Sequence, residues 1–184
     1  MFDGLIRARI DPPMNALGRR VAALRVTADQ VTIVGLLAGV SAGAAIAAGW
    51  FILALALIAA SRFADGLDGA VARATRKTDL GGYLDIVFDF VFYAAVPLGF
   101  VLHDPAANGI AGAVLLAAFY INGATFLAFA ALAAKRGLST EVRGPKSIYY
   151  TTGLAEGTET ILVFVVLCLT PHWFAPIAFV FAGI

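Results

Sequence analysis

Cysteine and charge are both scarce in this chain of 184 residues. The single cysteine, Cys168, excludes an intrachain disulfide, and its apolar neighbours predict a buried structural thiol. Only 14% of the residues are charged and the net charge is +1, so the composition does not favour a nucleic-acid partner. By contrast, 61% of the residues are hydrophobic and the mean hydropathy is +0.89. This composition excludes an ordinary soluble domain and predicts an integral membrane protein.

Internal repeats, low-complexity tracts and a soluble second domain are also missing, and no cleavable signal peptide is expected. The apolar runs have the length of helices of about 20 residues, enough to cross about 30 Å of hydrocarbon. We expect helices near residues 30–48, 51–73, 81–102, 108–134 and 147–169, and a sixth run that starts near Trp173 and is still apolar at Ile184. The sequence therefore predicts an all-α bundle of six transmembrane helices over residues 29–184, with the sixth helix truncated.

The lysines and arginines indicate how this bundle is oriented. All 13 fall into three clusters, at residues 7–25, 62–77 and 135–146, and the connections near residues 49, 103–108 and 171–173 carry none. By the positive-inside rule the three clusters are cytoplasmic. We therefore expect the N-terminus to lie inside.

Residues 1–28 precede the first expected span and are amphipathic. Pro12 and Pro13 should break any helix that precedes them. Beyond them an apolar stripe recurs at helical spacing with three arginines off it, namely Met14, Leu17, Val21 and Leu24, with Arg19, Arg20 and Arg25. We expect either an interfacial helix on the cytoplasmic leaflet, with its arginines facing anionic lipid, or an ordinary amphipathic helix packed on the rest of the protein.

Four aspartates interrupt the apolar sequence where the second and third expected helices meet. Asp65 and Asp68 are three residues apart near the end of one helix, and Asp85 and Asp89 are four apart near the start of the next, so each pair occupies one helix face. A short basic connection turns the chain back, which predicts antiparallel neighbours whose acidic faces converge. A charged side chain in the bilayer costs roughly 2.5–3.5 kcal/mol, so such a cluster needs compensation.

A divalent cation is the simplest compensation for these carboxylates. One or two Mg²⁺ or Mn²⁺ ions with oxygen-only ligands would relieve their mutual repulsion. Gly69 and Gly81 remove side chains on either side, which lets a phosphate-bearing ligand approach the backbone. Arg73 lies one turn beyond Gly69, and its forked guanidinium suits phosphate oxygens. These features predict a site for a pyrophosphate at a membrane surface.

The string Asp65-x-x-Asp68-Gly69-x-x-Ala72-Arg73, a seven-residue gap, then Gly81-x-x-x-Asp85-x-x-x-Asp89 resembles the signature of the CDP-alcohol phosphatidyltransferase family. The resemblance implies six transmembrane helices around a cytoplasm-facing cavity, generally in a homodimer. It also implies a transferase of phospholipid biosynthesis, which moves the phosphatidyl group of CDP-diacylglycerol, or the corresponding group of another CDP-alcohol, to a hydroxyl acceptor and releases CMP.

The resemblance further implies roles for eight residues. The metal ligands would be Asp65, Asp68 and Asp85, with Asp89 completing the cluster. Asp89 would also act as the general base on the acceptor hydroxyl. The residues that hold the CDP portion would be Gly69, Ala72, Arg73 and Gly81.

Acceptor choice is open at this stage. A basic cluster at the ends of the fourth and fifth spans could reach a phosphate on the acceptor or could simply set topology, and consists of Lys135, Arg136, Arg143 and Lys146. If it binds substrate, glycerol 3-phosphate is the favoured acceptor, with inositol phosphate, inositol, serine and phosphatidylglycerol as alternatives. Glu156 and Glu159 could contact substrate or pair with polar residues of the bundle.

Thr32 resembles a position where the family often has threonine near the nucleotide. A helix cap at Asp29 or a hydroxyl bonded back to the helix would also explain that segment.

Two other readings compete with the transferase. A cation- or proton-coupled transporter also uses intramembrane acids, but on several helices near the midplane and without an adjacent glycine and arginine. An inactive scaffold with the same fold is the second. Against the scaffold, every signature residue is present. Residues 146–160 are also similar to a segment of uncharacterised bacterial inner-membrane members of the family. We therefore expect a multi-pass protein of the inner membrane with its active site facing the cytoplasm.

Overall fold

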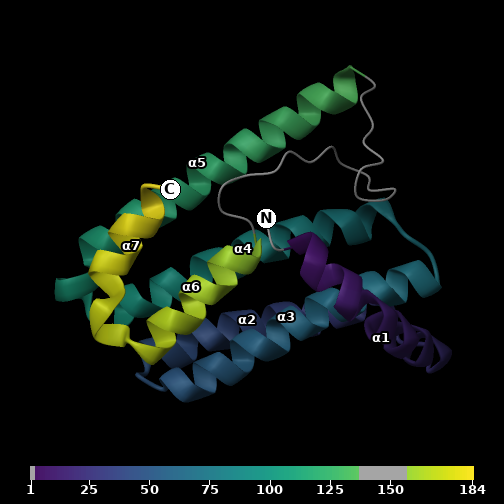
Figure 1. Ribbon diagram of the computed structural model, residues 1–184, viewed down its shortest axis with the longest axis horizontal. Helices are drawn as coiled ribbons and strands as arrows, with labels where there is room; N and C mark the ends of the chain where they lie inside the picture. Colours follow the sequence, from purple (N-terminus) through teal and green to yellow (C-terminus); the bar gives the residue numbers. More distant parts are fainter. Residues whose placement is uncertain (1–2, 137–156) are drawn as a thin grey trace.

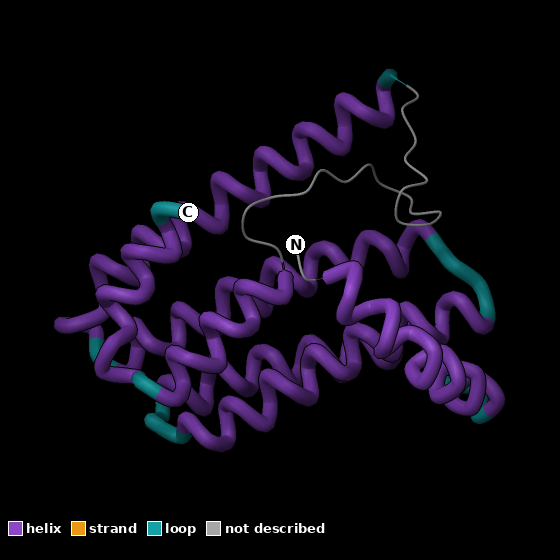
Figure 2. The backbone as a smooth tube through the Cα atoms, in the orientation of Figure 1, coloured by secondary structure: helices purple, strands orange, loops and turns teal. Residues whose placement is uncertain are grey.

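The computed structural model describes residues 3–136 and 157–184, and within these ranges the chain is helical with no strand (Figure 2). The helices run in the order α1 (Asp3–Ala23), α2 (Ala28–Ala47), α3 (Phe51–Ala74), α4 (Asp79–His103), α5 (Pro105–Lys135), α6 (Gly157–Leu169), a 3₁₀ turn η1 (Pro171–Trp173) and α7 (Phe174–Ala182). Four of the expected helices therefore correspond to α2 to α5 with ends shifted by a few residues. The first ten residues of the expected fifth span, 147–156, lie outside the described ranges.

Polar side chains fix where the helices begin. Thr27 and Gln30 form a reciprocal capping box, in which the Gln30 amide donates to Thr27 Oγ1 at 3.2 Å and the Thr27 amide donates to Gln30 Oε1 at 3.0 Å. Thr78 caps α4 and Asp104 caps α5: each side chain accepts a hydrogen bond from the backbone N–H three residues ahead. The cap of α2 is thus Thr27, and the expectation that Asp29 caps this helix was wrong.

Helix α2 is the element against which α3 and α4 both pack. Its glycine stripe allows this close approach: an added Cβ at Gly35 would lie 3.1 Å from Ala64 of α3, and one at Gly43 would lie 2.5 Å from the carbonyl oxygen of Ala95 in α4. Helices α3 and α4 run antiparallel, as expected, but make their main contacts with α2 rather than with each other (Figure 1). They therefore form two walls over a floor made by α2.

The core extends from Phe92, which borders the aspartates, toward the opposite end of the bundle. Four fully buried phenylalanines, Phe92, Phe100, Phe164 and Phe174, join α4 to α6 and α7, and the Phe100 and Phe174 rings stack at 4.8 Å. Cys168 is buried in the same cluster, which confirms the expected structural thiol. This packed end holds the helices while their other ends bear the acidic residues.

Three described helices, α2, α4 and α5, are long and apolar enough to cross a membrane, and a fourth span results if α6 and the segment 171–182 are taken as one span bent by 118°. Helix α3 has 24 residues but carries Arg62, Asp65 and Asp68 within its apolar length. The structure is thus that of an all-α membrane protein.

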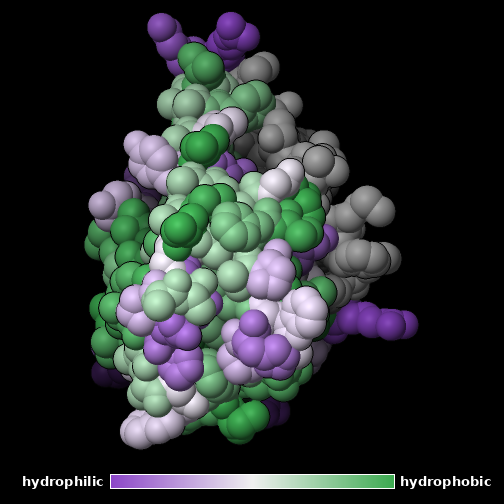
Figure 3. Space-filling model, turned by 90° about the vertical axis from the view of Figure 1, so that its left-hand side faces the viewer, coloured by the Kyte–Doolittle hydropathy of each residue, from purple (hydrophilic) through white to green (hydrophobic). Residues whose placement is uncertain are grey.

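Figure 3 looks onto the end of the bundle formed by the α2–α3, α4–α5 and α6–α7 connections, where hydrophobic residues cover much of the surface.

Helix α1 differs from the expectation. The break expected at Pro12 and Pro13 was wrong, because α1 runs through both prolines from Asp3 to Ala23. A proline leaves the carbonyl four residues earlier without its donor. Residues 9–13 are exposed, so the surroundings of this segment can supply hydrogen bonds in place of those that the prolines remove. Helix α1 then packs across α3 (Figure 1).

Candidate active site between three helices

A pocket open at one side lies between the floor helix α2 and the two wall helices. It is lined by Thr32, Gly35 and Leu36 of α2, by Ser61, Arg62, Asp65 and Asp68 of α3, and by Asp85, Phe88 and Asp89 of α4. All four aspartates singled out in the sequence are therefore brought together. Their spacing of three and four residues places each pair on the inner face of its helix.

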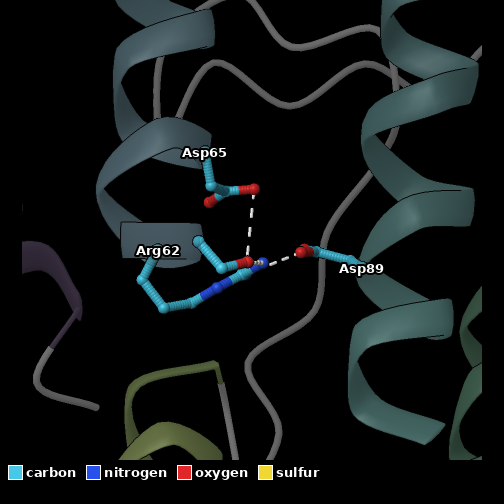
Figure 4. A network of polar contacts seen from close by, with 4 residues as sticks. Arg62, Asp65 and Asp89 are labelled. Atoms are coloured by element: carbon cyan, nitrogen blue, oxygen red, sulfur yellow. Dashed lines mark hydrogen bonds and ion pairs between the residues drawn. The ribbon is translucent and has the colours of Figure 1, made fainter. Parts of the chain in front are cut away.

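Arg62 lies among these carboxylates (Figure 4). Its Nη1 donates to Asp89 Oδ1 at 2.7 Å across the pocket and lies 3.8 Å from Asp65 Oδ1 on its own helix. The first distance is that of a charge-assisted hydrogen bond, and the second is a longer ion pair. One side chain of α3 thus links the two acidic walls.

Further contacts hold the guanidinium of Arg62. Nη2 donates to Ser61 Oγ at 3.3 Å, and the guanidinium carbon lies 4.2 Å from the centre of the Phe92 ring, in cation–π range. Its Nε is buried without a hydrogen-bond partner among the described residues. The two terminal nitrogens of Arg62 therefore have hydrogen-bond acceptors, whereas its Nε has none among the described residues.

Asp68 is the most enclosed of the four aspartates. It is only 6% exposed, and its Oδ2 is buried without a hydrogen-bond partner in the part of the chain that the structure describes. Such a buried, unpaired carboxylate oxygen is costly unless a cation or donor reaches it. With four carboxylates as the donor set, the pocket has the hard oxygen ligands that Mg²⁺ and Mn²⁺ prefer.

The carboxylates are not gathered into a closed cage. Among residues 3–136 and 157–184, no three acidic, histidine or cysteine side chains lie close enough to hold one metal ion. Arg62 Nη1 stands between Asp65 and Asp89 instead. The residue types fit a divalent cation, and their present arrangement is one in which an arginine provides the positive charge.

Arg73 lies near the end of α3, about one turn beyond Asp68, and contacts α1. Its Nη1 lies 3.2 Å from the position that a Cβ would take at Gly69, so the guanidinium covers that glycine. Its Nε donates to Asn15 Oδ1 of α1 at 2.9 Å. Ala72 is half-buried beside it. Gly69, Ala72 and Arg73 thus form a small surface at the end of α3, which α1 helps to shape.

Gly81 lies in the first turn of α4. Its amide donates to Thr78 Oγ1 at 2.9 Å, and an added Cβ would lie 3.3 Å from Asp29 Oδ1. The starts of α2 and α4 therefore meet at this glycine. Thr32, a helical turn further along α2, lines the pocket and donates back to the Ala28 carbonyl at 2.9 Å. This confirms the hydroxyl bonded back to the helix, and a position near the nucleotide stays a prediction.

Lys135 and Arg136, two of the four basic residues proposed for the acceptor, are not among the residues that line the pocket. Lys135 and Arg136 are exposed at the far end of α5, which extends beyond the rest of the helices (Figure 1). Arg143 and Lys146 lie outside the described residues, as does Glu156. Glu159 is half-buried in the first turn of α6. The acceptor contacts therefore stay predictions.

Sequence reasoning missed Arg62 and Asn15. Arg62 was grouped with the charges that set topology, although an arginine inside an apolar helix, three residues before Asp65, is the type of residue that pairs with intramembrane acids. Asn15 gives no signal of its own, because its contact with Arg73 depends on how α1 crosses α3.

Comparison with known proteins gives consistent results. Residues 25–184 match the family model described as CDP-alcohol phosphatidyltransferase. Inner membrane protein YnjF of Escherichia coli (strain K12) is 48% identical over 184 residues, which is 100% of this chain and 89% of that protein.

Two archaeal proteins named archaetidylinositol phosphate synthase match about half of the chain. The one from Pyrococcus horikoshii is 37% identical over 98 residues, covering 53% of this chain and 52% of that protein. The one from Methanothermobacter thermautotrophicus is 44% identical over 89 residues, covering 48% of this chain and 42% of that protein.

Proposed function

Because this chain belongs to the CDP-alcohol phosphatidyltransferase family, we propose that it transfers a phosphatidyl group from CDP-diacylglycerol, or the equivalent group of another CDP-alcohol, to a hydroxyl acceptor and releases CMP. The chain is thus a membrane-embedded transferase of phospholipid biosynthesis. The observation that carries the finer proposal is the pocket in which Asp65, Asp68, Asp85 and Asp89 meet.

We expect these four carboxylates to hold Mg²⁺ or Mn²⁺. The unpaired, buried Oδ2 of Asp68 supports this, since it is an oxygen that needs a cation. A bound divalent cation would neutralise negative charge on the pyrophosphate of the donor.

Asp89 is proposed as the general base. It reaches the pocket from α4, opposite Asp65, and its side chain is 31% exposed, so an acceptor hydroxyl can approach it. The carboxylate would take the hydroxyl proton as the oxygen attacks the lipid-side phosphorus and CMP leaves.

The surface at the end of α3 is proposed to hold the CDP portion. The lack of a side chain at Gly69 lets the Arg73 guanidinium lie against the helix there, and this guanidinium would bind the phosphate oxygens. Ala72 borders this surface, and Gly81 would take the opposite side. Asn15 fixes one edge of the Arg73 guanidinium and leaves its terminal nitrogens for the ligand.

For the acceptor we propose a phosphorylated polyol. The basic residues at the end of α5 and beyond favour a substrate with its own phosphate, such as glycerol 3-phosphate. The two relatives named archaetidylinositol phosphate synthase favour inositol phosphate. Both acceptors share the chemistry of a phosphate next to a free hydroxyl.

We also propose that the protein resides in the inner membrane as a homodimer, with the pocket facing the cytoplasm. The inner membrane protein of Escherichia coli supports the location, and the three basic clusters support the orientation. Helix α5 offers a large apolar surface to lipid or to a second copy, since only 11% of its spanning window is buried. Labelling of single cysteines at either end of α4 would test the orientation.

CMP release tests the reaction. The full chain in lipid nanodiscs would be given CDP-diacylglycerol with Mg²⁺ or Mn²⁺ and, separately, glycerol 3-phosphate, inositol phosphate, inositol, serine or phosphatidylglycerol. We expect release with a phosphorylated acceptor and its loss in Asp89→Asn, which keeps the shape of the side chain. Unaltered release in Asp89→Asn would refute the assignment of the base, and no release with any acceptor would refute the proposed donor or acceptor class.

A further inference from the structure

We propose that Arg62 serves as a built-in cation of the active site, which pairs with Asp89 while the divalent cation is absent and must leave that carboxylate when the metal binds. The inference rests on the proposed function only where that function requires a metal at the aspartates. It assigns a role to a residue that lies outside the signature string.

The first support is position. Arg62 comes from the middle of α3 and crosses the pocket to Asp89 on α4, with Nη1 at 2.7 Å from Oδ1 (Figure 4). The same nitrogen is 3.8 Å from Asp65 Oδ1. Arg62 therefore occupies the space between two carboxylates that a metal ion would have to share. A cation of radius well below that of a guanidinium cannot bind both while Nη1 stands there.

The second support is charge. Four aspartates face one pocket, and Arg62 is the basic side chain that lines it with them. Without a cation, convergent carboxylates in partly buried surroundings repel one another and destabilise the helix pair that bears them. A guanidinium between Asp65 and Asp89 offsets that repulsion and allows α3 and α4 to assemble on α2 before metal arrives.

The third support is how Arg62 is held. Its tip has a hydrogen bond with Ser61 Oγ and a ring face from Phe92, neither of which depends on the aspartates. Within residues 3–136 and 157–184, its Nε is buried without a hydrogen-bond partner, and so is Asp68 Oδ2. Arg62 thus provides a hydrogen bond to only some of the carboxylate oxygens, and one of its own N–H groups has no acceptor among the described residues. An arrangement of this kind can be exchanged for a metal-bound one, which would satisfy the remaining oxygens.

The test is a titration of Mn²⁺ into the full chain in lipid nanodiscs, followed by the electron paramagnetic resonance signal of free Mn²⁺. Arg62→Gln removes the competing charge, so we expect it to bind Mn²⁺ about tenfold more tightly or better than the wild type, the size expected for loss of a charge-assisted hydrogen bond in the competing state. Arg76→Gln is the matched control, because it removes the same charge from an exposed position after α3. It should leave the Kd unchanged.

A second measurement is thermal unfolding with and without Mn²⁺. Arg62→Gln should unfold at a lower temperature than the wild type in chelator and should gain more from Mn²⁺, since a tighter ligand stabilises more at one concentration. Arg62→Lys keeps the charge without the planar fork, so its Kd should fall between the other two. If Arg62→Gln does not fold, the Kd of Arg62→Lys for Mn²⁺ tests the inference, which requires it to be lower than that of the wild type.

Equal or weaker Mn²⁺ binding in the Arg62 variants would overturn the inference, because it would mean that the arginine orders Asp89 for the metal instead of competing with it. CMP release by the wild type together with that result would leave the proposed function standing. Tighter Mn²⁺ binding in Arg62→Gln without CMP release under any condition would support this inference and refute the proposed function. Absence of Mn²⁺ binding in every variant would overturn both this inference and the proposed metal dependence.

Discussion

A single methyl group at Gly18 should disturb the binding of the CDP donor. Gly18 is where α1 crosses α3, and an added Cβ would lie 2.7 Å from both the carbonyl carbon and the Cβ of Ala70. Ordinary contact between such atoms begins at about 3.4 Å, and backbone cannot rotate away as a side chain can. In Gly18→Ala, α1 must therefore withdraw by roughly 0.7 Å.

The withdrawal acts on Arg73 through Asn15. Asn15 precedes Gly18 by one helical turn, and its Oδ1 accepts from Arg73 Nε at 2.9 Å. A displacement of roughly 0.7 Å along this bond takes it beyond the limit of a hydrogen bond. The net contribution of such an exposed bond is about 0.5–1.5 kcal/mol, which corresponds to a rise of roughly two- to tenfold in KM for the donor if Arg73 binds it.

The assay is CMP release against CDP-diacylglycerol concentration at saturating metal and acceptor. We expect KM to rise in Gly18→Ala with little change in kcat, and Asn15→Ala to have a similar effect. Because both act through one contact, the double variant should be less impaired than the product of the two. Gly109→Ala, whose added Cβ meets nothing within 4 Å, is the control. A normal KM in a folded Gly18→Ala protein would refute the idea that α1 positions Arg73.

Three further outcomes are expected. Gly99→Ala should lower the unfolding temperature, at a cost of about 1–3 kcal/mol, because its Cβ would collide with the carbonyl oxygen of Gly43 in α2, while Gly109→Ala should not; scanning fluorimetry in detergent compares them. Thr27→Ala removes the capping box with Gln30 and should cost about 1 kcal/mol by the same method, whereas Thr27→Ser should be close to the wild type. Chelation with EDTA should abolish CMP release and excess Mg²⁺ or Mn²⁺ should restore it; full activity after dialysis against EDTA would contradict the proposed metal dependence.

The helices were predictable because their signals are local. Apolar length marks α2 to α5, and short connections limit them: a glycine-containing one at residues 48–50, and polar ones at residues 75–78 and 104. The convergence of the four aspartates was predictable for a related reason: spacings of three and four residues fix which side chains share a helix face, whatever the helix packs against. The glycines of α2 recur at four-residue spacing on one helix face, and an added Cβ at Gly35, Gly39 or Gly43 would meet atoms of α3 or α4.

What sequence could not supply is how elements far apart in the chain lie on one another. The expectation that α3 and α4 pack on each other did not include α2, which takes most of the contact of both. The pairing of Arg62 with Asp89 spans 27 residues and depends on that arrangement. Pro12 and Pro13 misled for a different reason, since their effect on a helix depends on whether the freed carbonyls can be solvated, and this is a matter of where α1 lies.

Because both acidic helices rest on α2, the size of a residue on α2 determines how far apart the two pairs of carboxylates stand. Gly39 lies at the centre of this support: an added Cβ would meet Phe92 of α4 at 2.8 Å and the Ser61 hydroxyl of α3 at 3.0 Å. Ions differ in the oxygen distances they accept, about 2.0–2.1 Å for Mg²⁺ and about 2.3–2.6 Å for Ca²⁺. In the proposed metal site, ion preference would therefore depend on a residue that contacts no ligand of the ion. A chain with alanine or serine in place of Gly39 would be expected to favour a larger cation while its signature stays intact.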